Sequence, residues 1–481
     1  MAGPTRRAAL RYYLLILALM ASGFGLDAGA LADSGGADGG VTPYPLPASA
    51  KEAYSPIGEG FESPLDPRDD LKGPKPYIDQ RELYLEAQRQ SRQIQAPFFR
   101  DTALKANSRT YLFDEDAFGN DTPEALTSGG YLSYQSGLVA EFLQLRGVLY
   151  TTQPLYANDD AGDTLNLTED GNQITTLGQI NARMRFAQQE LTVGRQLVRT
   201  PYINPYDVRM IPLTFEGIVL LPDRKDQPLQ YIASYLWRYK PRDQAAFISF
   251  SEGLDVEQDE GVLITGLRRR TKSWNYGLTN YWIKDTLNTA YGEIDYLLPF
   301  GGGDGQPSFR ISVNDLDQRS VGADLIAGAP YQTYQASARL IASYRNFVLT
   351  GAISRVGDGA DIQKPFGFST SFASMIVTSF NSAGERAYLA DLSYDFSDFG
   401  FEGIKVYVGW GRGTDIVDPG TGAPEPDQSE LDLRLSYEPH RGRLQGLRVE
   451  VDYIDLRQVD AGPSDDLRQF RAIVNYSMPL L

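Results

Sequence analysis

Residues 334–345 read Tyr334-Gln335-Ala336-Ser337-Ala338-Arg339-Leu340-Ile341-Ala342-Ser343-Tyr344-Arg345. Apolar and polar side chains alternate along this stretch, with Ile341 as an exception. Successive side chains of a β-strand point to opposite faces, so the alternation predicts a strand with one apolar face and one polar face. Tyr334 and Tyr344 lie at the two ends of the apolar face, as is typical of the aromatic girdles of membrane barrels.

The same period continues through most of the chain, from about Leu104 to Leu481. Further examples of alternation are residues 178–186, 309–314, 388–396 and 431–438. A soluble sandwich would have the apolar face as its core, whereas an outer-membrane barrel would turn that face to lipid. Aromatic residues at the ends of the apolar faces favour the barrel. The sequence therefore predicts an all-β protein, a transmembrane antiparallel β-barrel.

The connections between the predicted strands are of two kinds. Short turns such as Tyr344-Arg345-Asn346-Phe347 are expected on one side of the membrane, and long polar loops on the other, at 156–173, 298–307, 357–370 and 412–429. About 380 residues, at roughly 10 per strand plus connections, allow about sixteen to eighteen strands. A barrel of that size is wide enough to leave a channel.

The N-terminus has the features of an export signal. Arg6, Arg7 and Arg11 precede a short apolar run, and Ala30-Leu31-Ala32 is a small-residue cleavage site, so residues 1–32 are predicted to be a signal peptide. Residues 33–96 form a Pro/Gly-rich periplasmic extension, with a short helix expected over 78–95. The extension is interpreted as a tether or as a partner-binding helix, and residues 97–481 as the barrel domain.

The composition excludes several classes of site. The chain has no Cys and a single His, His440, which rules out thiolate nucleophiles and two-histidine metal sites. A net charge of −17 argues against a nucleic-acid binder. The run Gly301-Gly302-Gly303-Asp304-Gly305 leads into a predicted strand rather than a helix, so it is interpreted as a hairpin loop and not a phosphate site. No catalytic residue, cofactor or metal site is predicted.

Arginines recur on the polar faces of the predicted strands. Those assigned to the lumen are Arg183, Arg185, Arg310, Arg339 and Arg434, and we call these five the predicted ladder. Arginine stays charged and binds carboxylates with two hydrogen bonds, so a row of arginines would guide anionic solutes through a pore. The alternative is that each arginine pairs with an Asp or Glu of the wall for structural reasons alone.

Two patches of sequence resemble the OprD family of Gram-negative outer-membrane porins. One contains Gly384-Glu385-Arg386-Ala387-Tyr388 and Leu392-Ser393-Tyr394-Asp395-Phe396. The other contains Gly194-Arg195-Gln196, Arg209-Met210-Ile211-Pro212 and Thr214-Phe215-Glu216-Gly217. The chain departs from the family in having Ala387-Tyr388 where Ser-Trp is typical, in the extension at 33–96, and in ending without a terminal Phe.

The resemblance implies an eighteen-stranded barrel with inward-folded constriction loops. It also implies a basic wall that guides carboxylate-bearing nutrients, which we carry over to Arg183, Arg185, Arg339 and Arg434. Loop residues 198–212, with Arg199 and Arg209, are the candidate constriction. The expected function is passive, substrate-selective uptake of small carboxylates, such as amino acids or aromatic acids, across the outer membrane.

The partners expected of such a protein are lipid, lipopolysaccharide, small anionic solutes and the barrel-assembly machinery. A homotrimer is left open, and no nucleic acid is expected. The alternatives to a channel are a barrel enzyme and a structural or adhesin barrel plugged by its own loops. The single histidine lies in the turn Pro439-His440-Arg441-Gly442, and the sequence flags no nucleophilic Ser or acid to act with it, which argues against the enzyme.

Overall fold

The computed structural model describes residues 96–116, 122–223, 227–298, 307–326, 330–440, 442, 444–459 and 466–481. The predicted signal peptide, nearly all of the extension 33–96 and the helix expected over 78–95 lie outside the described residues. A short helix, α4 (Pro97–Arg100), precedes the first strand, and its Phe98 carbonyl accepts a hydrogen bond of 2.9 Å from the amide of Gly137. Among the described residues, no helix has the length and apolar character needed to cross a membrane.

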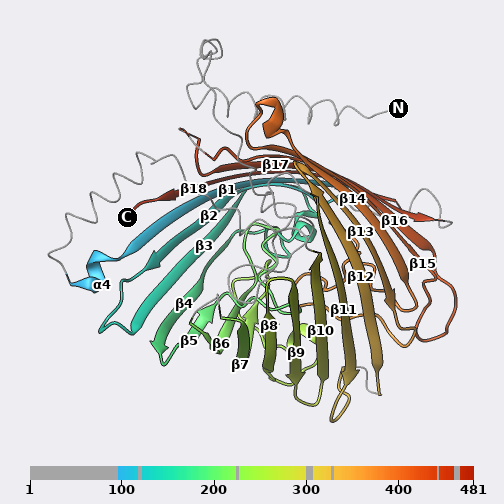
Figure 1. Cartoon of the computed structure of the whole chain (residues 1–481), viewed down its shortest axis with the longest axis horizontal. Helices are drawn as coiled ribbons and strands as arrows, with labels where there is room; N and C mark the ends of the chain where they lie inside the picture. Colours follow the sequence, from blue (N-terminus) through green and yellow to red (C-terminus); the bar gives the residue numbers. More distant parts are fainter. Residues whose placement is uncertain are drawn as a thin grey trace. The chain divides into compact units, whose positions relative to one another are not determined.

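Eighteen antiparallel strands form one closed sheet (Figure 1). Each strand pairs with its neighbours in the sequence, and β1 also pairs with β18, from Lys105 opposite Pro479 to Asp116 opposite Arg468. The predicted eighteen-stranded antiparallel barrel is therefore confirmed. The strands are β1 (Ala103–Asp116), β2 (Glu124–Gln135), β3 (Leu143–Ala157), β4 (Ile174–Phe186), β5 (Gln189–Gln196), β6 (Thr214–Pro222), β7 (Leu229–Lys240), β8 (Val262–Arg270), β9 (Trp274–Ile283), β10 (Leu287–Leu298), β11 (Ser308–Ser320), β12 (Gln332–Tyr344), β13 (Phe347–Val356), β14 (Arg386–Asp395), β15 (Ile404–Thr414), β16 (Asp427–Tyr437), β17 (Leu447–Val459) and β18 (Leu467–Pro479).

The two faces of the sheet follow the alternation. On β12, Thr333, Gln335 and Ser337 are buried inside the barrel, whereas Tyr334, Leu340 and Tyr344 are exposed on its outer surface. An apolar outer surface suits a hydrocarbon surrounding, and closure of the sheet leaves no unpaired strand edge there.

A bulge in β4 corrects one detail of the predicted faces. The pairing of β3 with β4 shifts between Val148 and Leu149, opposite Gln179 and Leu177. Gly178 therefore lies on the buried face together with Gln179, not on the outer face with Ile180. A bulge inserts one extra residue and exchanges the two faces beyond it, so strict alternation fails at this point.

The two ends of the barrel differ in the length of their connections. The end at which β1 begins and β18 ends carries eight of the connections between consecutive strands, including the turns after β4 and β12. The opposite end carries loop β5–β6 (197–213), loop β7–β8 (241–261) and loop β13–β14 (357–385). The sequence predicted that 298–307 would be one of the long loops on the side opposite the short turns. This prediction was wrong, because β10 ends and β11 begins at the short-turn end of the barrel.

The three long loops fold into the barrel, as the resemblance implied. Tyr202 of loop β5–β6 and Phe250 of loop β7–β8 both pack on Phe366 of loop β13–β14, with ring centroids 6.0 and 4.8 Å apart. Asn204 joins two of these loops. Its backbone N–H donates to the Phe366 carbonyl (3.1 Å), and its side-chain Oδ1 accepts from the backbone N–H of Phe368 (3.1 Å). Apolar side chains thus fix the loops in the lumen. Figure 1 shows these loops inside the ring of strands.

Three short 3₁₀ helices complete the described elements. They are η2 (Ala161–Thr164), in the β3–β4 connection; η3 (Glu252–Leu254), in loop β7–β8; and η4 (Phe396–Phe399), which follows β14. Ala161 of η2 packs with Ala125 and Leu167, and Leu254 of η3 belongs to the same core cluster as Phe366.

Candidate solute pathway

Loop β5–β6 is fixed to the wall made by β1 and β18. Arg109 of β1 forms an ion pair of 2.7 Å with Asp207 of the loop, and it also donates to Asn475 of β18 (2.7 Å) and to the carbonyl of Arg209. On the other side, the amide of Met210 donates to Asn166 Oδ1 (3.1 Å). The loop is thereby held in place across part of the lumen.

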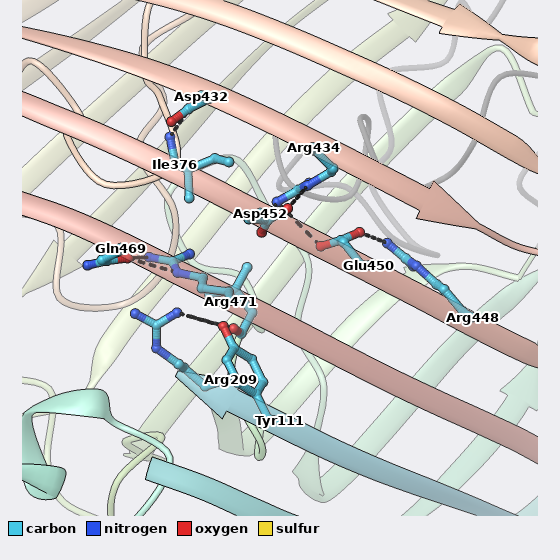
Figure 2. Close-up of polar contacts among 11 residues, drawn as sticks. Tyr111, Arg209, Ile376, Asp432, Arg434, Arg448, Glu450, Asp452, Gln469 and Arg471 are labelled. Carbon is cyan, nitrogen blue, oxygen red and sulfur yellow. Dashed lines mark hydrogen bonds and ion pairs between the residues drawn. The ribbon is translucent and has the colours of Figure 1, made fainter. Parts of the chain in front are cut away.

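Arg209, a predicted constriction residue, is buried at this point. Its guanidinium lies 5.0 Å from the centre of the Phe113 ring, and its Nη1 donates to the hydroxyl of Tyr111 (3.3 Å) (Figure 2). Burial and repulsion by Arg471 lower the pKa of Arg209 to about 10, which leaves the group cationic at neutral pH. Within the described residues, no carboxylate lies within 4 Å of it.

Arg471 of β18 lies beside Arg209. Its guanidinium is 5.6 Å from the centre of the same Phe113 ring, and it donates to Oε1 of Gln469 (2.8 Å from Nε) (Figure 2). The side chain is almost fully buried, at 5% exposure. A neutral amide is a weak substitute for a carboxylate, so the positive charge of Arg471 is left largely uncompensated by its hydrogen bonds.

Two further cations surround Tyr206 of loop β5–β6. The guanidinium of Arg242 lies 4.4 Å from the centre of the Tyr206 ring, and that ring packs on Phe368 with centroids 5.3 Å apart. Lys364 of loop β13–β14 donates to the hydroxyl of Ser379. We call Arg209, Arg242, Lys364 and Arg471 the four-cation cluster.

The four cations of this cluster affect the pKa of the Tyr206 phenol. Burial alone would raise the pKa of Tyr206. Attraction to the positive charges of Arg242, Lys364, Arg209 and Arg471 outweighs burial, so the pKa lies below its usual value. Positive charges stabilise a phenolate, so the lowered pKa indicates that the four cations act together on Tyr206. Such a group of positive charges attracts anionic solutes.

Two carboxylates of β16 hold loop β13–β14, the loop to which Lys364 also belongs. Glu430 accepts hydrogen bonds from the amides of Val377 (2.8 Å) and Thr378 (2.6 Å), and Asp432 accepts one from Ile376 (3.1 Å; Figure 2). We call Glu430 and Asp432 the carboxylate latch. These acids bind backbone amides, and neither lies within 4 Å of a described cation of the four-cation cluster, although the charge of Glu430 attracts Lys364.

The predicted ladder divides into two groups. Arg310, Arg339 and Arg434 lie on the inner face, as the alternation predicted. Arg339 donates to Ser312 (3.3 Å) and lies 4.1 Å from the centre of the Phe372 ring. Arg434 forms ion pairs with Asp452 (2.6 Å) and Glu450 (3.3 Å) (Figure 2), so its charge is compensated.

Arg183 and Arg185 lie close to the short-turn end of β4. Both pair with Glu190 of β5, at 3.1 and 3.3 Å, across the turn at Ala187 and Gln188. The structure does not bring them together with Arg209. Arg199 is half-buried in loop β5–β6. A part in transport stays a prediction for each of these three arginines.

The sequence reasoning missed Arg242, Lys364 and Arg471. Arg471 could have been predicted from the alternation, because it lies on the polar face of the last strand, between the apolar residues Phe470 and Ala472. Arg242 and Lys364 belong to loops, where no period relates sequence to orientation. Only the folding of the loops into the lumen brings these cations together.

The described residues contain no group of three or more His, Asp or Glu side chains arranged to hold a metal ion. His440, the single histidine, follows β16 at the short-turn end.

Comparisons with known proteins agree with this architecture. Similar crystal structures include Pseudomonas aeruginosa OpdK with vanillate (20% identity, TM-score 0.70, 79% of this chain and 100% of that chain). Others are P. aeruginosa OccK9 (OpdG) (21%, 0.70, 80% and 100%) and P. aeruginosa OccK2 (OpdF) in complex with glucuronate (18%, 0.69, 80% and 100%). Identities this low show a shared fold alone. No curated protein sequence matches the chain.

A sequence model of the family described as outer membrane porin, OprD family, matches residues 96–480. The match spans the whole barrel and includes both patches that carried the resemblance. Proteins of this family are channels of the outer membrane through which small solutes pass, which gives this chain its location and its lipid surroundings. The chain belongs to the OprD family of outer-membrane porins.

Proposed function

We propose that this porin is selective for small solutes that carry a carboxylate. The observation that carries the proposal is the four-cation cluster, in which no described carboxylate lies within 4 Å of Arg209, Arg242, Lys364 or Arg471. Unpaired buried charge is costly, so such cations are best explained by a passing anion that compensates them.

The ligands of two similar structures support the same chemistry. OpdK was solved with vanillate and OccK2 with glucuronate, both of which are organic anions with a carboxylate. Arginine binds carboxylates through two parallel hydrogen bonds, which distinguishes them from spherical anions. The wall residues Arg310 and Arg339 then act as the approach to the cluster, whereas Arg434 is paired with Asp452 and Glu450 and serves the structure of the wall. This role extends the predicted ladder.

The test is a planar-bilayer recording of the purified protein in a gradient of KCl. We expect the reversal potential to indicate a preference for anions. The variant Arg209→Gln/Arg471→Gln should reduce that preference severalfold, because two of four positive charges are removed. Arg457→Ala is the matched control, since Arg457 lies on the outer face and pairs with Asp455 (2.9 Å). A wild-type channel that prefers cations would refute the proposal.

A plugged structural barrel is the second candidate. It is favoured by the packing of Tyr202, Phe250 and Phe366, which fills part of the lumen with apolar side chains. It predicts that folded protein inserted in a bilayer passes no current. The same recording therefore separates the two functions.

We further propose that residues 1–32 are removed on export and that 33–96 remain in the periplasm as a tether. The N-terminal sequence of the mature protein tests the first point, and a start at Asp33 is expected. A homotrimer and assistance by the barrel-assembly machinery stay predictions.

A further inference from the structure

We propose that the four-cation cluster is a binding site for solutes with two carboxylates, and that this porin prefers them to solutes with one. The inference rests on the proposed anion selectivity and adds the charge of the preferred substrate. It is carried by the balance of charge in the cluster and by the way the four cations are divided between two places.

The balance of charge leaves positive charge uncompensated. Asp207 is committed to Arg109 at 2.7 Å, and the carboxylate latch is committed to three backbone amides. The acids whose charges act on the cluster are Glu115, which accepts from Gln469, Asp243, next to Arg242 in the chain, and Glu430, which attracts Lys364. Four cations against these three acids leave a net positive charge, and within the described residues none of the three acids lies within 4 Å of a cation of the cluster.

The four cations form two pairs. Arg209 and Arg471 both lie over the ring of Phe113, at 5.0 and 5.6 Å from its centre, beside β1 and β18. Arg242 and Lys364 lie at Tyr206, which packs on Phe368 of loop β13–β14. The two pairs are linked through loop β5–β6, because Tyr206 and Arg209 are three residues apart in it, and the charges of all four cations act on the Tyr206 phenol.

Two separate pairs suit two separate negative groups. A dicarboxylate can place one carboxylate at each pair, whereas inorganic phosphate concentrates its charge in a single group. A monocarboxylate leaves one of the two pairs uncompensated. Arg434 differs from the four cations of the cluster, because it pairs with Asp452 at 2.6 Å and with Glu450 at 3.3 Å.

The experiment measures how added solutes block the chloride current through single wild-type channels. Butyrate, succinate and glutarate form a series of similar size, in which only the last two carry a second carboxylate. We expect succinate or glutarate to block at a concentration about tenfold lower than butyrate, the effect of one added charge-assisted contact. Equal block by butyrate and the dicarboxylates would overturn the inference.

Variants locate the second carboxylate. Lys364→Gln should raise the blocking concentration of succinate and glutarate toward that of butyrate, whereas Lys364→Arg should keep the preference. If Lys364→Gln fails to fold, Arg242→Gln tests the same pair. Arg457→Ala serves again as the control, with the preference unchanged.

The outcomes separate this inference from the function on which it rests. A channel that prefers chloride to potassium but does not distinguish succinate from butyrate keeps the proposed function and refutes the dicarboxylate site. A channel with no preference for anions refutes both. Inorganic phosphate that blocks better than glutarate also refutes the inference, since it would indicate one compact site instead of two pairs.

Discussion

At the scale of single residues, the described lumen contains two kinds of buried charge. Arg434 has acidic partners at 2.6 and 3.3 Å, and Lys405 pairs with Asp395 at 3.4 Å. Arg209 and Arg471 have instead a phenol, an amide and an aromatic ring. The first kind is compensated by acids of the wall, whereas the second has no described carboxylate within 4 Å. Position on the inner face is therefore not sufficient to assign an arginine to the pathway.

Glu385 gives the residue-scale prediction. Its carboxyl group is buried in loop β13–β14, and accepts from Gln428 (2.7 Å) and from the Ser382 amide (3.0 Å). Burial raises the pKa of Glu385 to about 7; the charges of Asp361 and Asp427 add to the rise, and the two hydrogen bonds oppose it. In the folded loop, Glu385 therefore stays protonated up to about pH 7, whereas in an unfolded loop it loses its proton above about pH 4.5.

The sign of the pH dependence follows from this difference. A raised pKa contributes stability that is complete below about pH 4.5 and is lost as the pH rises through about 7, amounting to about 3 kcal/mol at most. After correction for intrinsic rates, amide exchange of residues 381–385 should be faster at pH 8 than at pH 5. Glu385→Gln should remove the dependence, and Glu425→Gln, at an exposed loop carboxylate, should retain it. Equal exchange at both pH values would contradict the prediction.

At the scale of elements, the loops are as well fixed as the strands. Loop β5–β6 is tied to β1 through Arg109, and loop β13–β14 is tied to β16 through the carboxylate latch. Asn204 joins one loop to the other. The width of the pore is thus set by contacts between loops and wall, since the strands fix only the outer diameter.

The latch gives the prediction at this scale. Glu430→Gln replaces an accepting oxygen by the NH2 group of a carboxamide, which cannot accept from a backbone N–H, so at least one hydrogen bond from Val377 or Thr378 is lost. The loss should cost about 1–3 kcal/mol of local stability. Single-channel records should then show more frequent current fluctuations and a larger mean conductance.

Ser429→Ala is the control for the latch, because Ser429 lies on the same strand but on the opposite face. Unchanged noise and conductance in Glu430→Gln would show that the loop is held without this carboxylate.

The strands were far more predictable than the site. Alternation identified β12 and assigned Arg339 and Arg434 to the lumen, because a strand relates sequence to orientation through a fixed period. The bulge at Gly178 broke that relation locally. Ion pairs were predictable only across tight turns, as for Arg185 and Glu190, whereas Arg434 and Asp452 meet through pairing between strands.

At the scale of the whole molecule, the lumen is narrowed by loops that belong to the barrel itself. The described chain enters the barrel at α4, where Phe98 and Gly137 are hydrogen-bonded. Nothing from the predicted extension is required to explain the packing of Tyr202, Phe250 and Phe366.

Deletion of residues 33–95 tests the extension. We expect the shortened protein to keep the conductance and the anion preference of the full chain within about twofold, because the loops alone define the constriction. The deletion retains Ala96 and α4, so the contact of Phe98 with Gly137 is preserved. A large increase in conductance on deletion would show that the extension is a plug and would replace the tether interpretation.

The pairing of β1 with β18 also determines when the barrel can close during folding. Arg109 and Asn475, which meet at this seam, are separated by 366 positions, so the cylinder cannot close until translation and export of the whole chain are complete. Contacts between such distant residues form slowly. Asp207 and Arg209 dock on Arg109 at that same seam. We therefore expect the constriction formed by loop β5–β6 to take its final position last, after β1 has paired with β18.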